Sequence, residues 1–156
     1  MRPIYIFDVD GTLAFINHRV HILDQKDNPN RWRKFYSLCY RDEPNKPVIQ
    51  IMNNLLLLGA QVLLFSGRSE EVRSKTVTWL AEHTGLTTSE LQEPGFLTMR
   101  QEMDYTPDDV LKESWLDNMI EYDRHRIAAV FDDRDRVVSM WRRRGITCLQ
   151  VANGDF

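Results

Sequence analysis

Short apolar runs that alternate with helix-like runs are the feature of this chain that most limits its fold. The apolar runs occupy residues 4–7, 62–65, 96–99, 127–131 and 147–151. The helix-like runs between them occupy residues 48–58, 70–83, 106–122 and 134–144. Right-handed crossovers join strands of this kind into a parallel sheet, and strands that are apolar throughout are buried on both faces. The pattern predicts an α/β fold, a Rossmann-like parallel sheet of about five strands with flanking helices.

Residues with known positional preferences mark the expected helix ends. Thr106 is a candidate N-cap and Pro107 fits the first turn, so we expect a helix to begin there and to run to about residue 122. Gly59 fits the position that follows a helix end, because a residue without a Cβ adopts positive φ readily.

The segment from residue 14 to residue 46 interrupts the alternation. It separates the first strand from its expected crossover helix, and within it residues 31–40 form a helix-like run rich in aromatic residues and arginine. We expect this segment, 14–46, to be a small helical cap over the strand ends, although a purely structural surface excursion would have the same pattern. The chain has 156 residues and no evident linker, so we expect 1–156 to form a single domain.

Composition and charge exclude several classes of protein. The chain is 42% hydrophobic and 28% charged, and no run approaches the roughly 18 apolar residues that span a membrane. Cys39 and Cys148 are too few for a disulfide scaffold, and the start has no secretory segment. We therefore expect a cytoplasmic protein, in the host cytoplasm if a phage encodes it. The net charge of −3 argues against an overall electrostatic hold on nucleic acid.

Polar side chains that can do chemistry follow each of the first four predicted strands. In chain order they are Asp8 and Asp10, then Ser66 and Arg68 on either side of Gly67, then Arg100, and then Asp132 and Asp133. Parallel strands bring their carboxyl ends to one edge, so we expect these side chains to lie together. Two like charges about 4 Å apart cost about 4 kcal/mol at an effective dielectric near 20. A hard cation with oxygen ligands, Mg²⁺, removes that cost, and the serine and arginines remain to hold an anion.

The pair Asp8 and Asp10 is suited to three tasks, which are binding a cation, acting as a nucleophile and moving a proton. Gly11 lets the chain turn sharply after them, and a plain turn after a strand would have the same letters. The residue types do not decide which of the two carboxylates attacks. A cation, a nucleophilic carboxylate and phosphate-binding groups together indicate phosphoryl transfer.

Four motifs, Asp-Val-Asp-Gly-Thr, Ser-Gly-Arg, a later lysine and Phe-Asp-Asp, occur in the order found in haloacid dehalogenase-like phosphohydrolases, and the chain resembles that family. The resemblance implies that Asp8 is the nucleophile that forms an aspartyl-phosphate. It implies that Asp10 protonates the leaving oxygen and later activates water, that Ser66 binds the phosphoryl group and that Lys112 neutralises charge beside the nucleophile. It also implies a Mg²⁺ site, with ligands from Asp8, the backbone carbonyl of Asp10, Asp132 and Asp133.

A closer resemblance covers nearly the whole chain and is to the 3′-phosphatase domain of phage polynucleotide kinase/phosphatases. It depends on D-V-D-G-T-L-A, S-G-R, M-R followed by D-D-V-L-K-E, and the run from Phe131 to Phe156. It implies a 3′-phosphate on a nucleic-acid end as substrate, with Arg19, Arg68 and Arg100 around the scissile phosphate. No G-x-x-x-x-G-K-[ST] phosphate loop occurs in the sequence, so we expect phosphate removal alone, with a separate kinase or ligase as a candidate partner.

Other functions fit the same residues. One alternative is a phosphatase of free nucleotides or of another small phosphoester. Another is a non-catalytic nucleic-acid-binding or interaction module that docks through its 134–144 helix, although the intact set of acids argues against a pure binder. Arg100 could instead pair with Glu102 or Asp104. The cations and aromatics of 31–36 fit either an amphipathic cap helix or contacts with single-stranded bases.

Overall fold

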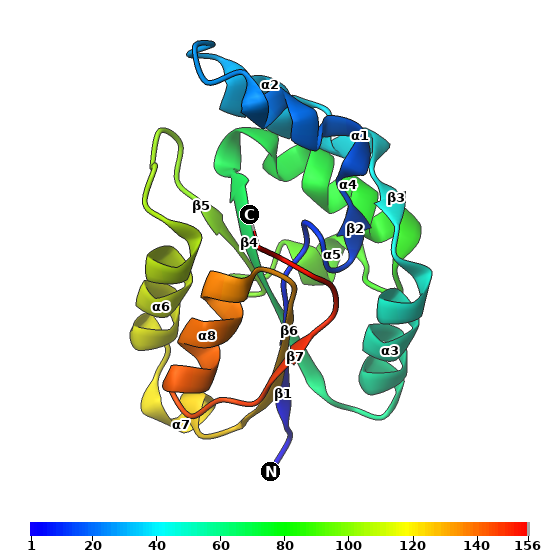
Figure 1. Cartoon of the computed structure of the whole chain (residues 1–156). Coiled ribbons are helices and arrows are strands. Elements are labelled where there is room, and N and C mark those ends of the chain that lie inside the picture. The colour runs from blue at the N-terminus through cyan, green and yellow to red at the C-terminus, as the bar shows by residue number, and fades with distance from the viewer. Residues whose placement is uncertain (156) are drawn as a thin grey trace.

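A parallel sheet forms the centre of the computed structural model, which describes residues 1–155 (Figure 1). Its strand order is β5-β4-β1-β6-β7, and every pairing in this sheet is parallel. The strands are β1 (Ile4–Phe7), β4 (Gln61–Ser69), β5 (Leu97–Arg100), β6 (Ile127–Asp132) and β7 (Cys148–Gln150). The α/β fold class and the number of strands predicted from the sequence are confirmed.

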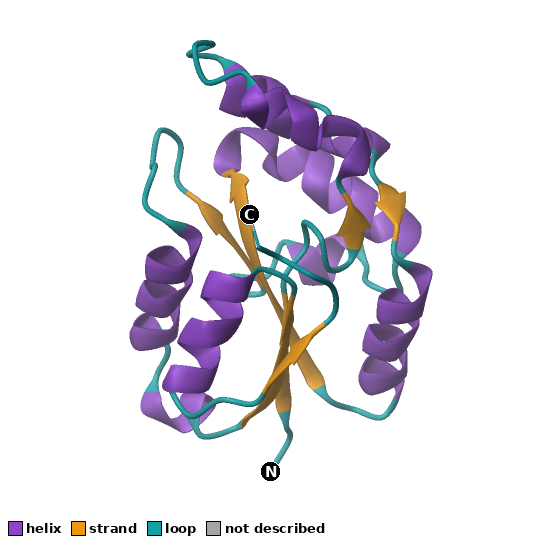
Figure 2. Ribbon diagram, viewed as in Figure 1, coloured by secondary structure: helices purple, strands orange, loops and turns teal. Residues whose placement is uncertain are grey.

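Helices cover both faces of this sheet. The four longest are α3 (Lys46–Leu57), α4 (Arg73–His83), α6 (Asp108–Asn118) and α8 (Asp135–Arg143). One core cluster joins α3 and α4 to one face of the sheet, and a second joins α6 and α8 to the other. Figure 2 shows α3 on the opposite side of the sheet from α6 and α8. Within β1, Ile4 and Ile6 face the second cluster and Phe7 faces the first, as the two-residue period of a strand requires.

Several element boundaries differ from the sequence predictions. The expected N-cap at Thr106 is wrong, because α6 begins at Asp108 after Pro107, and the Thr106 hydroxyl donates to Asp104 Oδ1 at 2.6 Å. The same helix ends at Asn118, and a separate short helix, α7, spans Glu121–Arg124. The predicted helix over 70–83 begins as a 3₁₀ turn, η3 (Glu70–Val72), before α4.

A short helix that the sequence analysis did not predict follows α4. This helix, α5 (Thr88–Leu91), has a capping box in which Thr87 accepts from the Glu90 amide and the Glu90 side chain accepts from the Thr87 amide. The pattern Thr-x-x-Glu is a known sequence signal for a helix start, so this element was predictable.

The 14–46 segment contains two short strands and four short helical elements. They are β2 (Ala14–Phe15), α1 (Asn17–Val20), η1 (His21–Asp24), α2 (Arg31–Ser37), η2 (Cys39–Arg41) and β3 (Glu43–Pro44). β2 and β3 pair antiparallel and close the segment at its base. In Figure 1, α1 and α2 lie beyond the carboxyl end of β4, at the top of the view. We call this segment the cap.

Two further sequence expectations concern cysteines and membranes. Cys39 and Cys148 are both buried and both free thiols, and they belong to different core clusters. Over residues 1–155, no helix combines the length and the apolar character needed to cross a membrane.

Trp141 tests the packing of α8 against the sheet. It is fully buried in the second core cluster, so Trp141→Ala is expected to lower the free energy of unfolding by about 3–5 kcal/mol, measured by urea denaturation. Leu57, 85% exposed at the end of α3, is the matched control, and Leu57→Ala should change the same quantity by less than about 0.5 kcal/mol. Similar losses for both variants would contradict the assigned packing.

Candidate active site

The ends of β1, β5 and β6 lie at the carboxyl edge of the sheet. Asp8 directly follows β1, Arg100 ends β5, and Asp132 ends β6 with Asp133 directly after it. The amide of Asp8 donates to the Phe131 carbonyl at 2.9 Å, which ties the end of β1 to β6. The structure brings together the carboxylates of Asp8, Asp132 and Asp133, and Arg100 lines the same cavity.

Lys112 lies between two of these carboxylates. Its ammonium Nζ is 2.7 Å from Asp8 Oδ1 and 2.8 Å from Asp132 Oδ2, and the side chain is buried. Burial alone would lower the pKa of Lys112, but Asp132 and Asp8 outweigh it and raise the pKa above its ordinary value. The other oxygen of Asp8, Oδ2, accepts from the Thr12 hydroxyl at 3.1 Å. Helix α6 thus places a permanent positive charge beside Asp8.

Three buried carboxylates, those of Asp8, Asp132 and Asp133, form a cluster that suits a metal ion. One oxygen from each lies within 4.8 Å of the others. Burial, followed by Asp132, raises the pKa of Asp133 to about 7, and burial also raises the pKa of Asp8 well above its ordinary value despite Lys112. The excess of negative charge over the single ammonium, and the all-oxygen donor set, fit Mg²⁺. The Asp10 side chain is not a member of this cluster.

Asp10 belongs to a separate buried ion network that joins the sheet to the cap. Asp10 Oδ1 is 2.7 Å from Arg19 Nη2 in the cap and 2.7 Å from Arg68 Nη2 in β4. Both arginines also contact Asp42 Oδ2, at 2.6 Å for Arg19 and 2.8 Å for Arg68. Burial pushes the pKa of Asp10 upward, but Arg68 and Arg19 together hold it below its ordinary value. In the free protein, Asp10 is therefore ionised at neutral pH and fixed in orientation.

Asp42 is a residue of this network that the sequence analysis missed. Its side chain is fully buried, and its Oδ1 accepts from Arg19 Nε at 2.7 Å and lies 2.8 Å from His18 Nε2. Its backbone carbonyl accepts from the Trp79 indole at 2.9 Å. No signal in the sequence distinguishes this residue, because Arg-Asp-Glu between two helices is typical of an exposed loop.

Arg100 uses its guanidinium mainly on neighbouring loops. Nε donates to the Gly67 carbonyl at 2.9 Å, and Nη1 donates to the carbonyls of Asp104 at 3.0 Å and Thr106 at 2.6 Å. Nη2 pairs with Asp108, which also contacts Arg134 Nη1 at 2.5 Å. Arg100 therefore holds residues 101–107, which we call the β5–α6 loop, against the end of β4. Asp104, which the sequence offered as an ion-pair partner of Arg100, contacts it through the backbone carbonyl.

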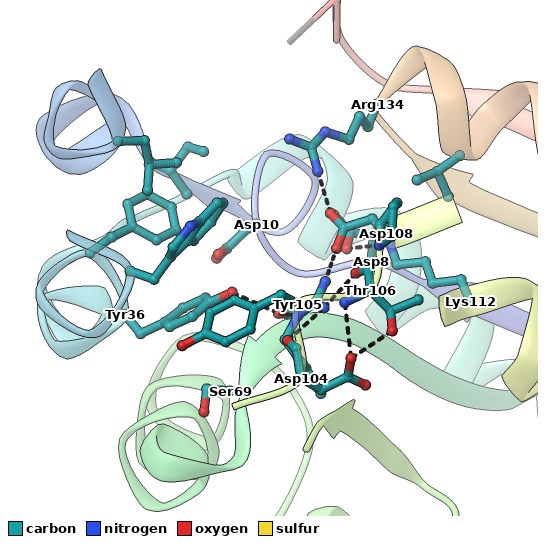
Figure 3. Close-up of a pocket in the computed structure, with 18 of the residues that line it drawn as sticks. Asp8, Asp10, Tyr36, Ser69, Asp104, Tyr105, Thr106, Asp108, Lys112 and Arg134 are labelled. Carbon is teal, nitrogen blue, oxygen red and sulfur yellow. Dashed lines mark hydrogen bonds and ion pairs between the residues drawn. The ribbon is translucent and has the colours of Figure 1, made fainter. Parts of the chain in front are cut away.

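A cavity of about 510 Å³ opens over these side chains. Among the predicted site residues, those on its surface are Asp8, Asp10, Gly67, Arg100, Lys112, Asp132 and Asp133. Arg19, Ser66 and Arg68 do not line it, because each is fully buried behind Asp10 or within β4. The Ser66 hydroxyl accepts from the Arg68 amide at 3.2 Å. Figure 3 shows Asp8 and Asp10, from the segment after β1, and Lys112, from α6, around this space. Roles for these residues in binding a phosphate stay predictions.

The end of β7 and the residues after it brace the turn that carries Asp132 and Asp133. The Val151 amide donates to the Asp132 carbonyl at 3.1 Å, and Gln150 Nε2 donates to the Asp133 carbonyl at 2.9 Å. The Gly154 carbonyl accepts from the Asp135 amide at 2.8 Å, at the start of α8. A Cβ at Gly154 would lie 2.1 Å from the Asp133 carbonyl oxygen, so only glycine permits this approach.

The fold, with its carboxylate cluster and buried lysine at the carboxyl edge, defines a haloacid dehalogenase-like phosphatase. Solved structures of low sequence identity share the fold. The class C acid phosphatase from Bacillus anthracis has a TM-score of 0.66 and 12% identity over 99% of this chain and 68% of its own.

Comparison with family models assigns the chain to one family within this class. The family model described as the polynucleotide kinase PNKP phosphatase domain matches residues 2–156, and the chain belongs to that family. Two solved structures, described as the Pnkp1/Rnl/Hen1 RNA repair complex and the Pnkp1/Rnl/Hen1 complex, each contain a chain 31% identical over 99% of this one, with TM-scores of 0.75 and 0.77. This chain spans 44% and 48% of those chains. Membership implies a hydrolase of phosphomonoesters, and phosphatases of this class generally use Mg²⁺.

Gly11 tests the close packing of the carboxylate cluster. It has φ of +83°, and a Cβ would lie 2.1 Å from Asp133 Oδ2. Gly59 has φ of +84° with no atom within 4 Å of such a Cβ, so Gly59→Ala carries only the conformational cost of about 1–2 kcal/mol. Gly11→Ala should lower the free energy of unfolding by about 1–3 kcal/mol more than Gly59→Ala, measured by urea denaturation. Equal losses would show that Asp133 does not lie against Gly11.

Binding of Mg²⁺ to the free protein tests the carboxylate cluster itself. At a Mg²⁺ concentration of about 100 times Kd, the melting temperature should rise by about 5–10 °C, because only the folded chain holds the three carboxylates together. Asp133→Asn should remove most of that rise. Glu71→Gln is the control, since Glu71 lines the same cavity outside the cluster and should leave the rise unchanged. A full response in Asp133→Asn would refute the assigned ligand.

Proposed function

We propose that this chain removes the 3′-phosphate from polynucleotide ends through an aspartyl-phosphate on Asp8. The observation that carries the proposal is the position of Asp8, on the cavity surface and 2.7 Å from the Lys112 ammonium, in a chain of the PNKP phosphatase family. A carboxylate that faces an open cavity and lies beside a fixed positive charge is suited to attack an anionic phosphoryl group.

In the first step, an oxygen of the ionised Asp8 attacks phosphorus in line with the leaving group. The negative charge of the bound phosphate opposes that of the Asp10 carboxylate, so Asp10 takes up a proton from water when the substrate binds. The bond from phosphorus to the 3′ oxygen breaks, and Asp10 gives this proton to that oxygen. Asp10 lies on the cavity surface near Asp8, and Arg19 and Arg68 hold its Oδ1 from behind, so its other oxygen is available to the substrate. The products are a polynucleotide with a free 3′ hydroxyl and a mixed anhydride of Asp8 and phosphate.

In the second step, Asp10 takes a proton from a water molecule, whose oxygen attacks phosphorus. The bond between phosphorus and the Asp8 oxygen breaks, which releases inorganic phosphate and restores the carboxylate. Lys112 stays between Asp8 and Asp132 and offsets their charge throughout. Asp10 thus regains in the second step the proton that it gave in the first, and it is ionised again once phosphate has left.

The Mg²⁺ ligands that we assign are the carboxylates of Asp8, Asp132 and Asp133 and the backbone carbonyl of Asp10. When bound, Mg²⁺ offsets the negative charge on the transferred phosphoryl group. Gly67 and Arg100, both on the cavity surface, are assigned to the substrate, and so is Ser66 on the basis of its motif. Arg19 and Arg68 are assigned to holding Asp10 and to the positive potential around the phosphate.

The polynucleotide end is favoured as the substrate by family membership and by an open rim. Met103 and Tyr105 line the cavity and are 80% and 72% exposed, so a long substrate can leave the cavity without displacing buried groups. One of the Pnkp1-containing structures at 31% identity is described as an RNA repair complex and the other as a Pnkp1/Rnl/Hen1 complex. These descriptions extend the proposal to RNA ends and to partner proteins, for which a separate kinase or ligase is our candidate. A cavity of about 510 Å³ also has the volume of a small-molecule site, so free nucleotides are the competing substrates.

A comparison of four substrates and three variants tests the proposal. Phosphate release is measured with a 3′-phosphorylated oligonucleotide, a 5′-phosphorylated one, a 3′-mononucleotide and a 5′-mononucleotide. The first should be hydrolysed fastest, removal of Mg²⁺ with a chelator should abolish turnover, and Asp8→Asn, Asp8→Ala and Asp10→Ala should each lower kcat by at least about 1,000-fold. Full activity of Asp8→Asn would exclude covalent catalysis, and equal rates on all four substrates would exclude specificity for 3′ ends.

A further inference from the structure

Beyond the carboxylates of its floor, the cavity has an apolar part that phosphate chemistry does not use. One wall comes from the cap and includes Trp32, Phe35 and Tyr36 of α2. The opposite wall comes from the β5–α6 loop and includes Met103 and Tyr105. Figure 3 shows Tyr36 and Tyr105 projecting into the cavity from these two elements. We call the space between the two walls the aromatic slot.

The cap wall of the aromatic slot is held in place by buried contacts. The Trp32 and Tyr36 rings lie 5.9 Å apart and 30° from parallel, and the Trp32 and Phe35 rings meet edge to face at 6.0 Å. The Tyr36 hydroxyl donates to the Gly67 carbonyl at 3.2 Å. Burial raises the pKa of Tyr36 to about 12, so this hydroxyl keeps its proton at neutral pH. The aromatic surface is therefore preorganised at the end of β4.

The loop wall is also preorganised, although its side chains are exposed. Arg100 binds two carbonyls of the loop, and Asp104 Oδ1 accepts from the amide and the hydroxyl of Thr106 at 2.9 and 2.6 Å. Met103 has a φ of 59°, a conformation that costs free energy for a residue with a side chain. These hydrogen bonds hold Met103 and Tyr105 over the cavity with most of their surface in water, where they contribute little to the core.

Cations stand at the rim of the cavity. Arg33 and Arg136 both line it, and their side chains are 71% and 64% exposed. Each contacts one carboxylate, Glu71 at 2.7 Å for Arg33 and Asp109 at 3.3 Å for Arg136. Ion pairs this exposed exchange partners at little cost, so both guanidiniums can meet phosphate groups of a chain that leaves the slot.

We propose that the aromatic slot binds the nucleobase of the nucleotide whose phosphate reaches Asp8, with the base between Trp32 of the cap and Tyr105 of the loop. The inference deepens the proposed function, on which it rests, by naming what the enzyme recognises next to the phosphate. The slot is continuous with the carboxylate floor, is apolar where a flat ring would lie and is cationic at its rim. Stacking of this kind accepts any base, so the slot distinguishes nucleotides from other phosphoesters and does not read sequence.

A substrate whose last nucleotide lacks its base tests whether the enzyme recognises the base in addition to the phosphate. The substrates are two 3′-phosphorylated oligonucleotides that differ only in whether the last nucleotide carries a base. The intact chain should hydrolyse the normal end with a kcat/KM about 10- to 100-fold above that of the abasic end. Trp32→Ala and Tyr105→Ala should each reduce this ratio to about 1–5, mainly through the normal end, and Trp32→Phe should keep most of it.

A matched aromatic residue of the cap provides the control. Tyr40 is 55% exposed, contacts Lys75 and does not line the cavity, so Tyr40→Ala should keep the full ratio. A 3′-mononucleotide serves as a further arm, because the slot predicts that it also depends on Trp32 and Tyr105, whereas the rim arginines act only on longer substrates. Loss of the ratio in Tyr40→Ala to the same extent would overturn the assignment to the slot.

Equilibrium binding keeps the inference testable apart from turnover. With Asp8→Asn, the normal 3′-phosphorylated oligonucleotide should bind about 10- to 100-fold more tightly than the abasic one, and Tyr105→Ala in the same background should remove the difference. Equal affinities, or equal kcat/KM values in an active enzyme, would overturn the slot and leave the 3′-phosphatase proposal intact. Absence of turnover on every 3′-phosphate, with the binding difference preserved, would overturn the proposed function and support the slot.

Discussion

Compensation of buried negative charge at the carboxyl edge of the sheet determines how the rest of the site is built. Asp8, Asp132 and Asp133 crowd around the single ammonium of Lys112, whereas Asp10 and Asp42 are matched by Arg19 and Arg68. The second group is neutral as a whole and is complete without any ligand. The first group retains an excess of negative charge, and this excess is what makes it a place for a divalent cation. The two adjacent groups of carboxylates therefore differ in what they can bind, because arginines neutralise one group and a single lysine leaves the other with excess negative charge.

The neutral group also explains why the cap belongs to the site. Arg19 and Asp42 come from the cap, whereas Asp10 and Arg68 come from the sheet, and all four meet in one buried network. Separation of the cap from the sheet would leave these charges buried without partners, which costs about 3–5 kcal/mol for a single broken pair. We therefore expect the cap to keep its place during turnover, with access to the cavity through the exposed rim near Tyr105.

The sequence was sufficient for the sheet, the chain order of its strands and the edge at which the chemistry would lie. Apolar runs predict strands wherever both faces are buried, and parallel topology then places the residues that follow them at one edge. The sequence was insufficient to predict which groups Arg19 and Arg100 contact. Asp42 lies 23 residues after Arg19 in an unremarkable polar loop, and only the folded cap brings the two together. Arg100 looked like a phosphate ligand by its position at the end of a strand. Its guanidinium nevertheless donates to the carbonyls of Gly67, Asp104 and Thr106 and pairs with Asp108, and no spacing rule predicts these contacts.

The bracing of the Asp132–Asp135 turn by residues 150–154 has a consequence for handling the protein. Val151, Gln150 and Gly154 all contact backbone atoms within that turn, so the last strand and the residues after it form part of the frame that orients Asp132 and Asp133. Shortening the chain to residue 149, with or without a bulky tag fused there, would remove these contacts and loosen the frame. The effect would reach the site even though residues 150–154 do not line the cavity. Met1, which is 87% exposed at the opposite end of β1, is the safer point of attachment for an affinity tag or a fluorophore.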